Sequence, residues 1–164
     1  MVRIYTVGII TASDRASSGL REDKSGPRII DVVESRGHTV SKYIILPDDV
    51  DKLKEEMIFM CDSLKVNLLL TTGGTGFSRR DVTPEATCSI IERKAPGIAE
   101  AIRYFSFSIT PRAMLSRGVS GIRKETLIVN LPGSPKAVEE ALHFILESVE
   151  HGLEVLLGKV ADCG

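Results

Sequence analysis

The chain contains no tryptophan, and aromatic side chains make up only 5% of its 164 residues. Proteins that bind single-stranded nucleic acid commonly stack the bases on such side chains. The net charge is −1, so the chain also lacks the excess of lysine and arginine that a general nucleic-acid binder carries. We therefore expect no nucleic-acid partner.

Cysteine and histidine are scarce as well. Cys61, Cys88 and Cys163 are odd in number and far apart, which fits neither a disulfide framework nor a zinc site. We expect them to be reduced thiols without a chemical role. The three histidines are scattered along the chain, so a histidine metal centre has little support.

Long apolar runs are also missing. No stretch approaches the ~20 apolar residues of a membrane-spanning helix, and no signal-peptide pattern follows Met1. We expect a cytoplasmic protein that does not associate with membranes. With 43% hydrophobic residues, the chain is long enough to bury a full core, and we expect residues 1–164 to form one domain.

Strand and helix patterns alternate along the chain. Apolar, β-branched runs predict strands at 4–11, 39–46, 66–71 and 126–130. Apolar residues spaced by three or four, with suitable starting residues, predict helices at 25–37, 50–64, 83–91 and 98–107, and from 135 onward. The segment 108–125 fits either a hairpin or a short edge strand. This order predicts an α/β fold: a single three-layer domain whose central sheet is mostly parallel and has helices on both faces.

Polar segments follow the predicted strands at the edge where parallel sheets bind ligands, outside the carboxyl ends of the strands. They are residues 13–19, 47–49, 71–84 and 130–134. Because each is a loop placed where this fold builds its sites, their convergence is stronger support for a site than any one motif.

The segment 71–84 is the most informative of the four. Its three glycines let backbone N–H groups approach a ligand, and a helix signal follows them, which together favour binding of a phosphate. Arg79 and Arg80 can add charge-assisted hydrogen bonds. Asp81 would repel an anion, so a divalent cation between the two is the simplest explanation. The segment therefore predicts a metal–nucleotide site.

Familiar nucleotide and hydrolase motifs are absent from the sequence. The lysine and hydroxyl residue of a phosphate-binding Walker loop are missing. The dinucleotide-binding fingerprint fails because Arg79 stands where its third glycine belongs. No G-x-S-x-G elbow supports Ser17 or Ser78 as a hydrolase nucleophile. These observations disfavour P-loop hydrolysis, hydride transfer and serine hydrolysis.

Six segments carry a resemblance that covers nearly the whole chain. They are Thr72-Gly73-Gly74-Thr75-Gly76, Arg80-Asp81-Val82-Thr83-Pro84-Glu85-Ala86-Thr87, Ser13-Asp14-Arg15-Ala16-Ser17-Ser18-Gly19, Pro47-Asp48, Met114-Leu115-Ser116-Arg117 and Asn130-Leu131-Pro132-Gly133-Ser134. This pattern resembles the molybdopterin adenylyltransferases of the MogA type, whose family includes the MoaB proteins and the G domain of gephyrin. The stretch 13–19 leans toward MogA rather than MoaB.

The resemblance implies a Mg²⁺-dependent transfer of AMP from ATP to molybdopterin, which gives adenylyl-molybdopterin and pyrophosphate. It also implies a homotrimer, and a MoeA-like enzyme that inserts molybdate downstream. By analogy, Asp48 and Asp81 are catalytic, and Asp81 is the first candidate to hold Mg²⁺, with Asp48 the second. The expected substrate-binding residues are Ser13, Asp14, Thr72, Gly73, Gly74, Thr75, Gly76, Arg80, Asn130, Pro132, Gly133 and Ser134.

Several of these residues have a purely structural alternative. Asp81 could pair with Arg80, and either Asp48 or Asp49 could cap the helix that begins near residue 50. Asp14 could form a salt-bridged turn with the neighbouring arginine, and Ser134 is a good helix cap with or without a ligand.

Two rival functions also stay open. The first is a non-catalytic, MoaB-like trimer that binds pterin. The second is a CinA-like enzyme that cleaves nucleotide pyrophosphates, although that group lacks the Arg80–Pro84 continuation found here.

Overall fold

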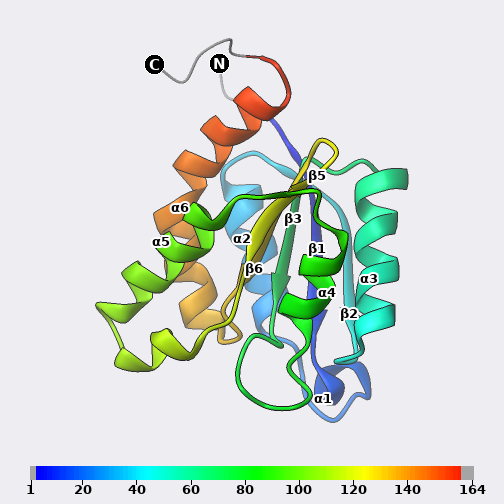
Figure 1. Ribbon diagram of the computed structural model, residues 1–164, viewed down its shortest axis with the longest axis vertical. Coiled ribbons are helices and arrows are strands. Elements are labelled where there is room, and N and C mark those ends of the chain that lie inside the picture. The colour runs from blue at the N-terminus through cyan, green and yellow to red at the C-terminus, as the bar shows by residue number, and fades with distance from the viewer. Residues whose placement is uncertain (1–2, 160–164) are drawn as a thin grey trace.

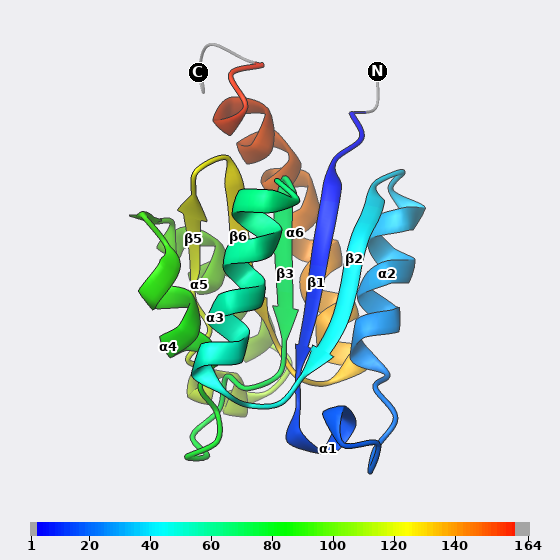
Figure 2. The same cartoon turned by 90° about the vertical axis from the view of Figure 1, so that its right-hand side faces the viewer.

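A computed structural model describes residues 3–159 of the chain. Its six-stranded sheet has the order β2-β1-β3-β6-β5-β4 and lies between two layers of helices (Figures 1 and 2). Four strands are mutually parallel: β1 (Thr6–Ala12), β2 (Thr39–Leu46), β3 (Leu68–Thr72) and β6 (Thr126–Leu131). The antiparallel edge consists of β5 (Ser120–Arg123) and β4 (Arg93–Lys94). The structure confirms the predicted α/β fold with a mostly parallel sheet.

Each face of the sheet packs against its own helices. On one face lie α2 (Ser25–Ser35), α5 (Pro96–Phe107) and α6 (Pro135–Leu156), and on the other lie α3 (Val50–Ile58) and α4 (Thr83–Ile90). Successive side chains of a strand point to opposite faces, so Val7 and Ile9 of β1 enter the first core while Ile10 enters the second. Burial on both faces explains why the central strands read as continuous apolar runs.

Some boundaries differ from the sequence prediction. The helix predicted over 50–64 is α-helical only to Ile58 and continues as a π-helix, η1 (Phe59–Ser63). Segment 108–125 contains a 3-10 helix, η2 (Pro111–Leu115), and then β5, which forms a hairpin with β6. Neither the one-turn helix α1 (Asp14–Ser17) nor the two-residue β4 was predicted, because elements this short have no periodicity.

The parallel strands end together at one edge of the sheet. Ala12 pairs with Leu46, Thr11 with Thr72, and Thr72 with Leu131, so the loops after all four strands emerge side by side. These loops meet near α1 at the bottom of Figure 2. The fold thereby brings together the four polar segments that the sequence singled out.

Two of the three cysteines can be located. Cys61 is buried, Cys88 is exposed, and neither forms a disulfide with another described residue; Cys163 lies outside the described residues. Within residues 3–159, no helix has both the length and the apolar character needed to cross a bilayer.

Candidate functional site

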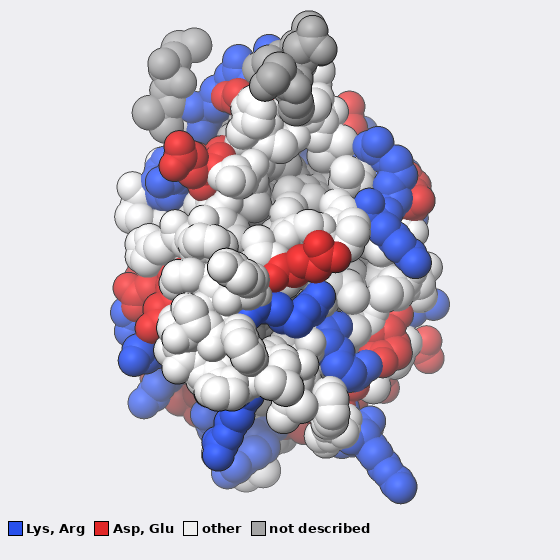
Figure 3. Space-filling view, turned by 60° about the vertical axis from the view of Figure 1, so that its left-hand side comes forward, with Lys and Arg blue, Asp and Glu red and all other residues white. Residues whose placement is uncertain are grey.

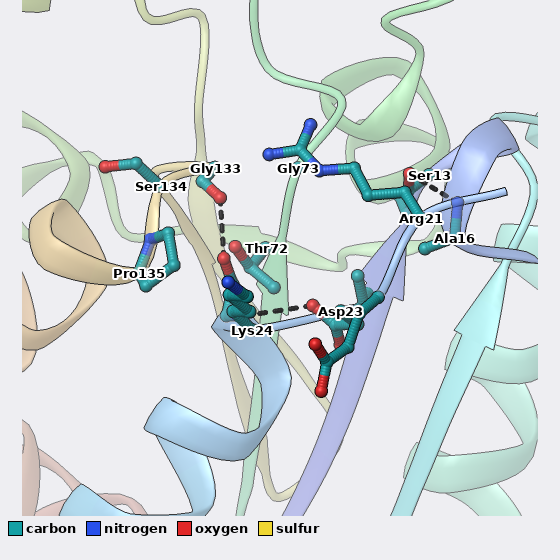
Figure 4. A pocket seen from close by; sticks show the side chains of 14 residues that line it. Ser13, Ala16, Arg21, Asp23, Lys24, Thr72, Gly73, Gly133, Ser134 and Pro135 are labelled. Carbon is teal, nitrogen blue, oxygen red and sulfur yellow. Dashed lines mark hydrogen bonds between the residues drawn. The ribbon is translucent and has the colours of Figure 1, made fainter.

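A cleft of about 700 Å³ opens at the carboxyl edge of the sheet (Figure 4). Five of the predicted residues line it: Ser13, Thr72, Gly73, Gly133 and Ser134. Its opposite wall is the segment 21–25, between α1 and α2, which sequence reasoning missed. The two walls are joined by the Ser25 hydroxyl, which donates a 2.7 Å hydrogen bond to the Gly133 carbonyl. The predicted acidic residues lie beyond the cleft lining, in an adjoining cluster.

Asp14 and Asp48 join the loops after β1 and β2 through two reciprocal hydrogen bonds. The Asp14 N–H donates to Asp48 Oδ2, and the Asp48 N–H donates to Asp14 Oδ1, each over 3.0 Å. Arg80 connects the glycine loop to this pair, because its Nε and Nη2 each donate to Asp14 over 2.9 Å. This bidentate pair lowers the pKa of the Asp14 carboxyl. Arg80 therefore pairs with Asp14, and the alternative in which it pairs with Asp81 was wrong.

The second oxygen of Asp48 is left without a partner. Asp48 Oδ1 is buried and accepts no hydrogen bond from any described residue. Burial raises the pKa of this carboxyl, and the nearby carboxylates of Asp14 and Asp81 raise it further. Asp49, not Asp48, caps α3, since its side chain accepts from the Lys52 N–H at 3.0 Å. Asp48 thus joins the two loops through Oδ2 and keeps Oδ1 available for a further partner.

The glycine loop passes directly against this cluster. Gly73 and Gly74 have φ of +87° and +70°, a region that side chains disfavour. A Cβ on Gly73 would lie 2.3 Å from the Ala12 carbonyl oxygen. One on Gly74 would lie 2.3 Å from Thr83 Oγ1 and 3.1 Å from Asp48 Oδ1. Glycine is therefore required for the loop to fit between the end of β1 and the unpartnered oxygen.

Arg117 fixes the far half of the loop, and sequence reasoning gave it no role. Its N–H donates to the Thr75 carbonyl at 2.8 Å, its Nε to the Gly76 carbonyl at 2.8 Å, and its Nη2 to the Asp81 carbonyl at 2.7 Å. The guanidinium also forms an ion pair with Glu85. Only the resemblance at 114–117 could have pointed to it, because a single arginine in a segment of unclear structure carries no pattern of its own.

Asp81 is only partly buried and turns toward the glycine loop. Its Oδ2 accepts the Ser78 N–H at 2.9 Å and lies 2.8 Å from where a Cβ on Gly76 would stand. Its charge acts on Asp48, so the two carboxylates share one electrostatic environment. Within residues 3–159, no group of three or more potential ligands from His, Cys, Asp and Glu is preassembled for a metal. Two carboxylates, one with an unpartnered buried oxygen, fit a Mg²⁺ ion that takes its other ligands from phosphate and water.

Three further predicted residues have structural contacts. Asn130 is 3% exposed; its Nδ2 donates to Thr71 and Thr87, and its Oδ1 accepts the Val119 N–H. It does not line the cleft and instead supports the strands beneath it. Thr72 Oγ1 donates to the Pro132 carbonyl at 2.6 Å, which ties the glycine loop to segment 130–134. Ser134 caps α6 by accepting the Ala137 N–H at 3.2 Å.

Known proteins share both the sequence and the fold. Residues 8–151 match the family model described as "Probable molybdopterin binding domain". A molybdopterin adenylyltransferase of Helicobacter pylori strain J99 is 40% identical over 93% of this chain and 88% of its own. Dictyostelium discoideum gephyrin is 40% identical over 94% of this chain, but this chain spans only 23% of gephyrin.

A solved structure agrees with these sequence matches. The molybdopterin biosynthesis enzyme MoaB of Thermus thermophilus superposes with a TM-score of 0.89 at 41% identity, over 94% of this chain and 97% of that one. Sequence and fold thus agree over more than nine-tenths of the chain. The protein therefore belongs to the probable molybdopterin binding domain family.

Proposed function

We propose that this protein transfers the adenylyl group of ATP to the terminal phosphate of molybdopterin and releases pyrophosphate. The observation that carries the proposal is the buried, unpartnered Oδ1 of Asp48, which lies against a glycine loop and beside Asp81. A site that binds phosphates and keeps a carboxylate oxygen free suits a reaction of a metal-bound nucleotide. The relative in Helicobacter pylori is named for this activity.

The reaction joins two anions, so the protein must neutralise charge and align the reactants. A phosphate oxygen of the pterin attacks the α-phosphorus of ATP; a new P–O bond forms, and the bond to the β-phosphate oxygen breaks. The electron pair of that bond leaves with pyrophosphate. Because the attacking phosphate is already ionised near neutral pH, no residue has to remove a proton from it.

Each part of the site has a defined task in this proposal. The N–H groups of the glycine loop hold one phosphate, and the N-terminus of α6 at Gly133 and Ser134 offers a second anion site. Asp48 and Asp81 would hold Mg²⁺, which supplies positive charge to the phosphates and the leaving group. Arg80 keeps Asp14 and Asp48 in place through the paired hydrogen bonds, and Ser13 lines the cleft beside them.

Pyrophosphate release from ATP, Mg²⁺ and freshly prepared molybdopterin tests the proposal. We expect pterin-dependent release by the wild type and a loss on the order of 100-fold in Asp81→Asn. Asp51→Asn, which changes an exposed carboxylate in the first turn of α3, is the matched control and should release pyrophosphate normally. Pterin binding without release would instead indicate the non-catalytic, MoaB-like alternative. Hydrolysis of ADP-ribose without pterin would indicate the CinA-like one.

We further propose that the protein forms a homotrimer through the surface over α5 and η2. Figure 3 shows a broad uncharged area on this face. Its large exposed apolar residues are Tyr104, Phe107, Ile109, Met114, Leu115 and Phe144. An apolar patch of this kind favours burial against another chain. Light scattering should give three times the mass of one chain, and Tyr104→Lys should lower it.

The proposed reaction also implies a setting for the protein. Because ATP is the adenylyl donor, the cytoplasm is its proposed compartment. The adenylylated pterin would then pass to a MoeA-like enzyme that inserts molybdate.

A further inference from the structure

The wall of the cleft formed by segment 21–25 lies almost entirely outside helices and strands, so side-chain contacts must hold it in place. Segment 21–25 joins α1 to α2, and three of its residues, Arg21, Glu22 and Lys24, are exposed. It nevertheless lies opposite the loops after β1, β3 and β6, as Figure 4 shows. The contacts that hold it there determine the width of the cleft.

The carboxylate of Asp23 provides most of these contacts. Asp23 Oδ2 accepts the Thr11 hydroxyl of β1 at 2.8 Å and also the Tyr43 hydroxyl of β2. Asp23 Oδ1 accepts the Ser25 N–H at 3.0 Å, and both oxygens accept the Gly26 N–H at 3.3 Å. One side chain thus fastens the wall to two strands and to the start of α2.

The packing around this carboxylate leaves no spare room. A Cβ on Gly26 would lie 2.4 Å from Tyr43 Cε2 and 2.5 Å from Asp23 Oδ2, so glycine is required there. Burial and the hydrogen bond to Asp23 raise the pKa of Tyr43, so its hydroxyl stays protonated and remains a donor. The Ser25 hydroxyl, next to this cluster, connects the wall to the other side of the cleft by its hydrogen bond to the Gly133 carbonyl.

Asp23 also determines where an anion can bind. Its oxygens accept the N–H groups of Ser25 and Gly26, the first two residues of α2, which have no partner within the helix. A helix start occupied by a carboxylate does not attract phosphate. At the same time, the wall presents the cations Arg21 and Lys24 to the cleft.

We propose that Asp23 is a positioning residue of the transfer reaction, which holds segment 21–25 as the substrate-facing wall of the cleft. The proposal rests on the proposed function. Asp23 acts through the wall and not on the reacting phosphates, so it contributes to substrate binding and leaves the chemical step to Asp48 and Asp81.

Steady-state kinetics separate these roles. In Asp23→Asn, we expect the KM for ATP or for molybdopterin to rise about tenfold, with kcat within threefold of the wild type. Tyr43→Phe, outside the cleft lining, removes a single donor to Asp23 and should raise the same KM two- to threefold. The control is Asp31→Asn, an exposed carboxylate of α2, which should change neither constant. Both KM values unchanged in Asp23→Asn, or a fall in kcat alone, would overturn the proposal.

Tryptic cleavage under native conditions tests the wall without any substrate. Trypsin cuts after Arg21 and Lys24, so we expect cleavage at these two sites at least tenfold faster in Asp23→Asn and measurably faster in Tyr43→Phe. Cleavage at the wild-type rate in both variants would contradict the positioning role. Because this measurement needs no turnover, it judges the role of Asp23 even if the wild type releases no pyrophosphate and the proposed function fails.

Discussion

Glu150, near the amino ends of the parallel strands, and Asp48, near their carboxyl ends, are carboxylates with opposite surroundings. At the amino edge, Glu150 accepts hydrogen bonds from Arg36 at 2.6 and 2.5 Å and contacts His38 at 2.8 Å. At the carboxyl edge, Asp48 keeps a buried oxygen without a partner among the described residues. Ion pairing lowers the pKa of Glu150, whereas burial raises that of Asp48. The first carboxylate is therefore satisfied within the fold, whereas the second keeps an oxygen available for the proposed metal.

The largest effect is expected for Asp48→Asn. We expect turnover to fall on the order of 100-fold, because the position loses a charge that the proposed metal needs. The same change should raise the free energy of unfolding by about 1 kcal/mol, because an unfavourable buried charge disappears. For a chain of this length, that corresponds to a rise in Tm of roughly 2–4 °C. Turnover assays and calorimetry check the pair of effects. A variant that keeps wild-type turnover would remove Asp48 from the chemistry.

Arg117→Met tests the support of the glycine loop. The change removes the side-chain hydrogen bonds to the carbonyls of Gly76 and Asp81, and we expect turnover to fall roughly 10-fold as the loop loosens. Arg93→Met, on the exposed edge strand β4, is the matched control and should be neutral. If both variants turn over alike, the loop does not depend on Arg117.

Glu150→Gln tests the amino edge. Because it removes a charge that pairs with the exposed Arg36 and contacts the buried His38, we expect a loss of about 1 kcal/mol in the free energy of unfolding. Turnover per folded molecule should stay at the wild-type level, since Glu150 lies at the opposite edge from the site. Urea unfolding and a pyrophosphate assay measure the two quantities. A matching loss of turnover would mean that the two edges are coupled.

The smallest expected effect is a pH dependence of opposite sign at the two positions. The pKa of Glu150 is lowered, so its contribution to stability is present at neutral pH and is lost as pH falls below 4.5 toward its folded value. The pKa of Asp48 is raised above 3.8, so its ionisation costs stability as pH rises through the folded value. At neutral pH, Glu150→Gln should therefore melt below the wild type and Asp48→Asn above it.

Acidification should bring both variants back to the wild type. The difference for Asp48→Asn should close at the higher pH, because the wild-type aspartate is protonated first. Calorimetry from pH 7 to 3 checks this order. Differences that stay constant across the range would show that neither carboxyl titrates with the shift described.

Sequence patterns predicted the long elements and the convergence of the polar loops that form the candidate site. Strand Thr39–Leu46 was predicted to the residue, because its β-branched and apolar residues stand between Gly37 and Pro47, which do not continue a strand. The end of α3 was not, since a π-helix keeps apolar residues on nearly the same face as an α-helix. The convergence of four polar loops followed from the rule for parallel sheets alone.

The contacts within the site could not be predicted in this way. The reciprocal hydrogen bonds of Asp14 and Asp48 depend on the register between β1 and β2, which no local pattern specifies. The same holds for Asp23, whose partners come from three different elements. Arg117 reaches the glycine loop across 41 residues of sequence.

The order of the strands along the chain also sets the order in which parts of the candidate site can form during synthesis. The Asp14–Asp48 contact spans 34 residues and can form once β1 and β2 have left the ribosome. The glycine loop follows with β3, and Gly133 arrives only with β6, which at about 5–20 residues per second is several seconds later. A nascent chain thus has Asp14 and Asp48 in place before the glycine loop and Asp81 emerge, and only a nearly finished chain has the complete candidate site.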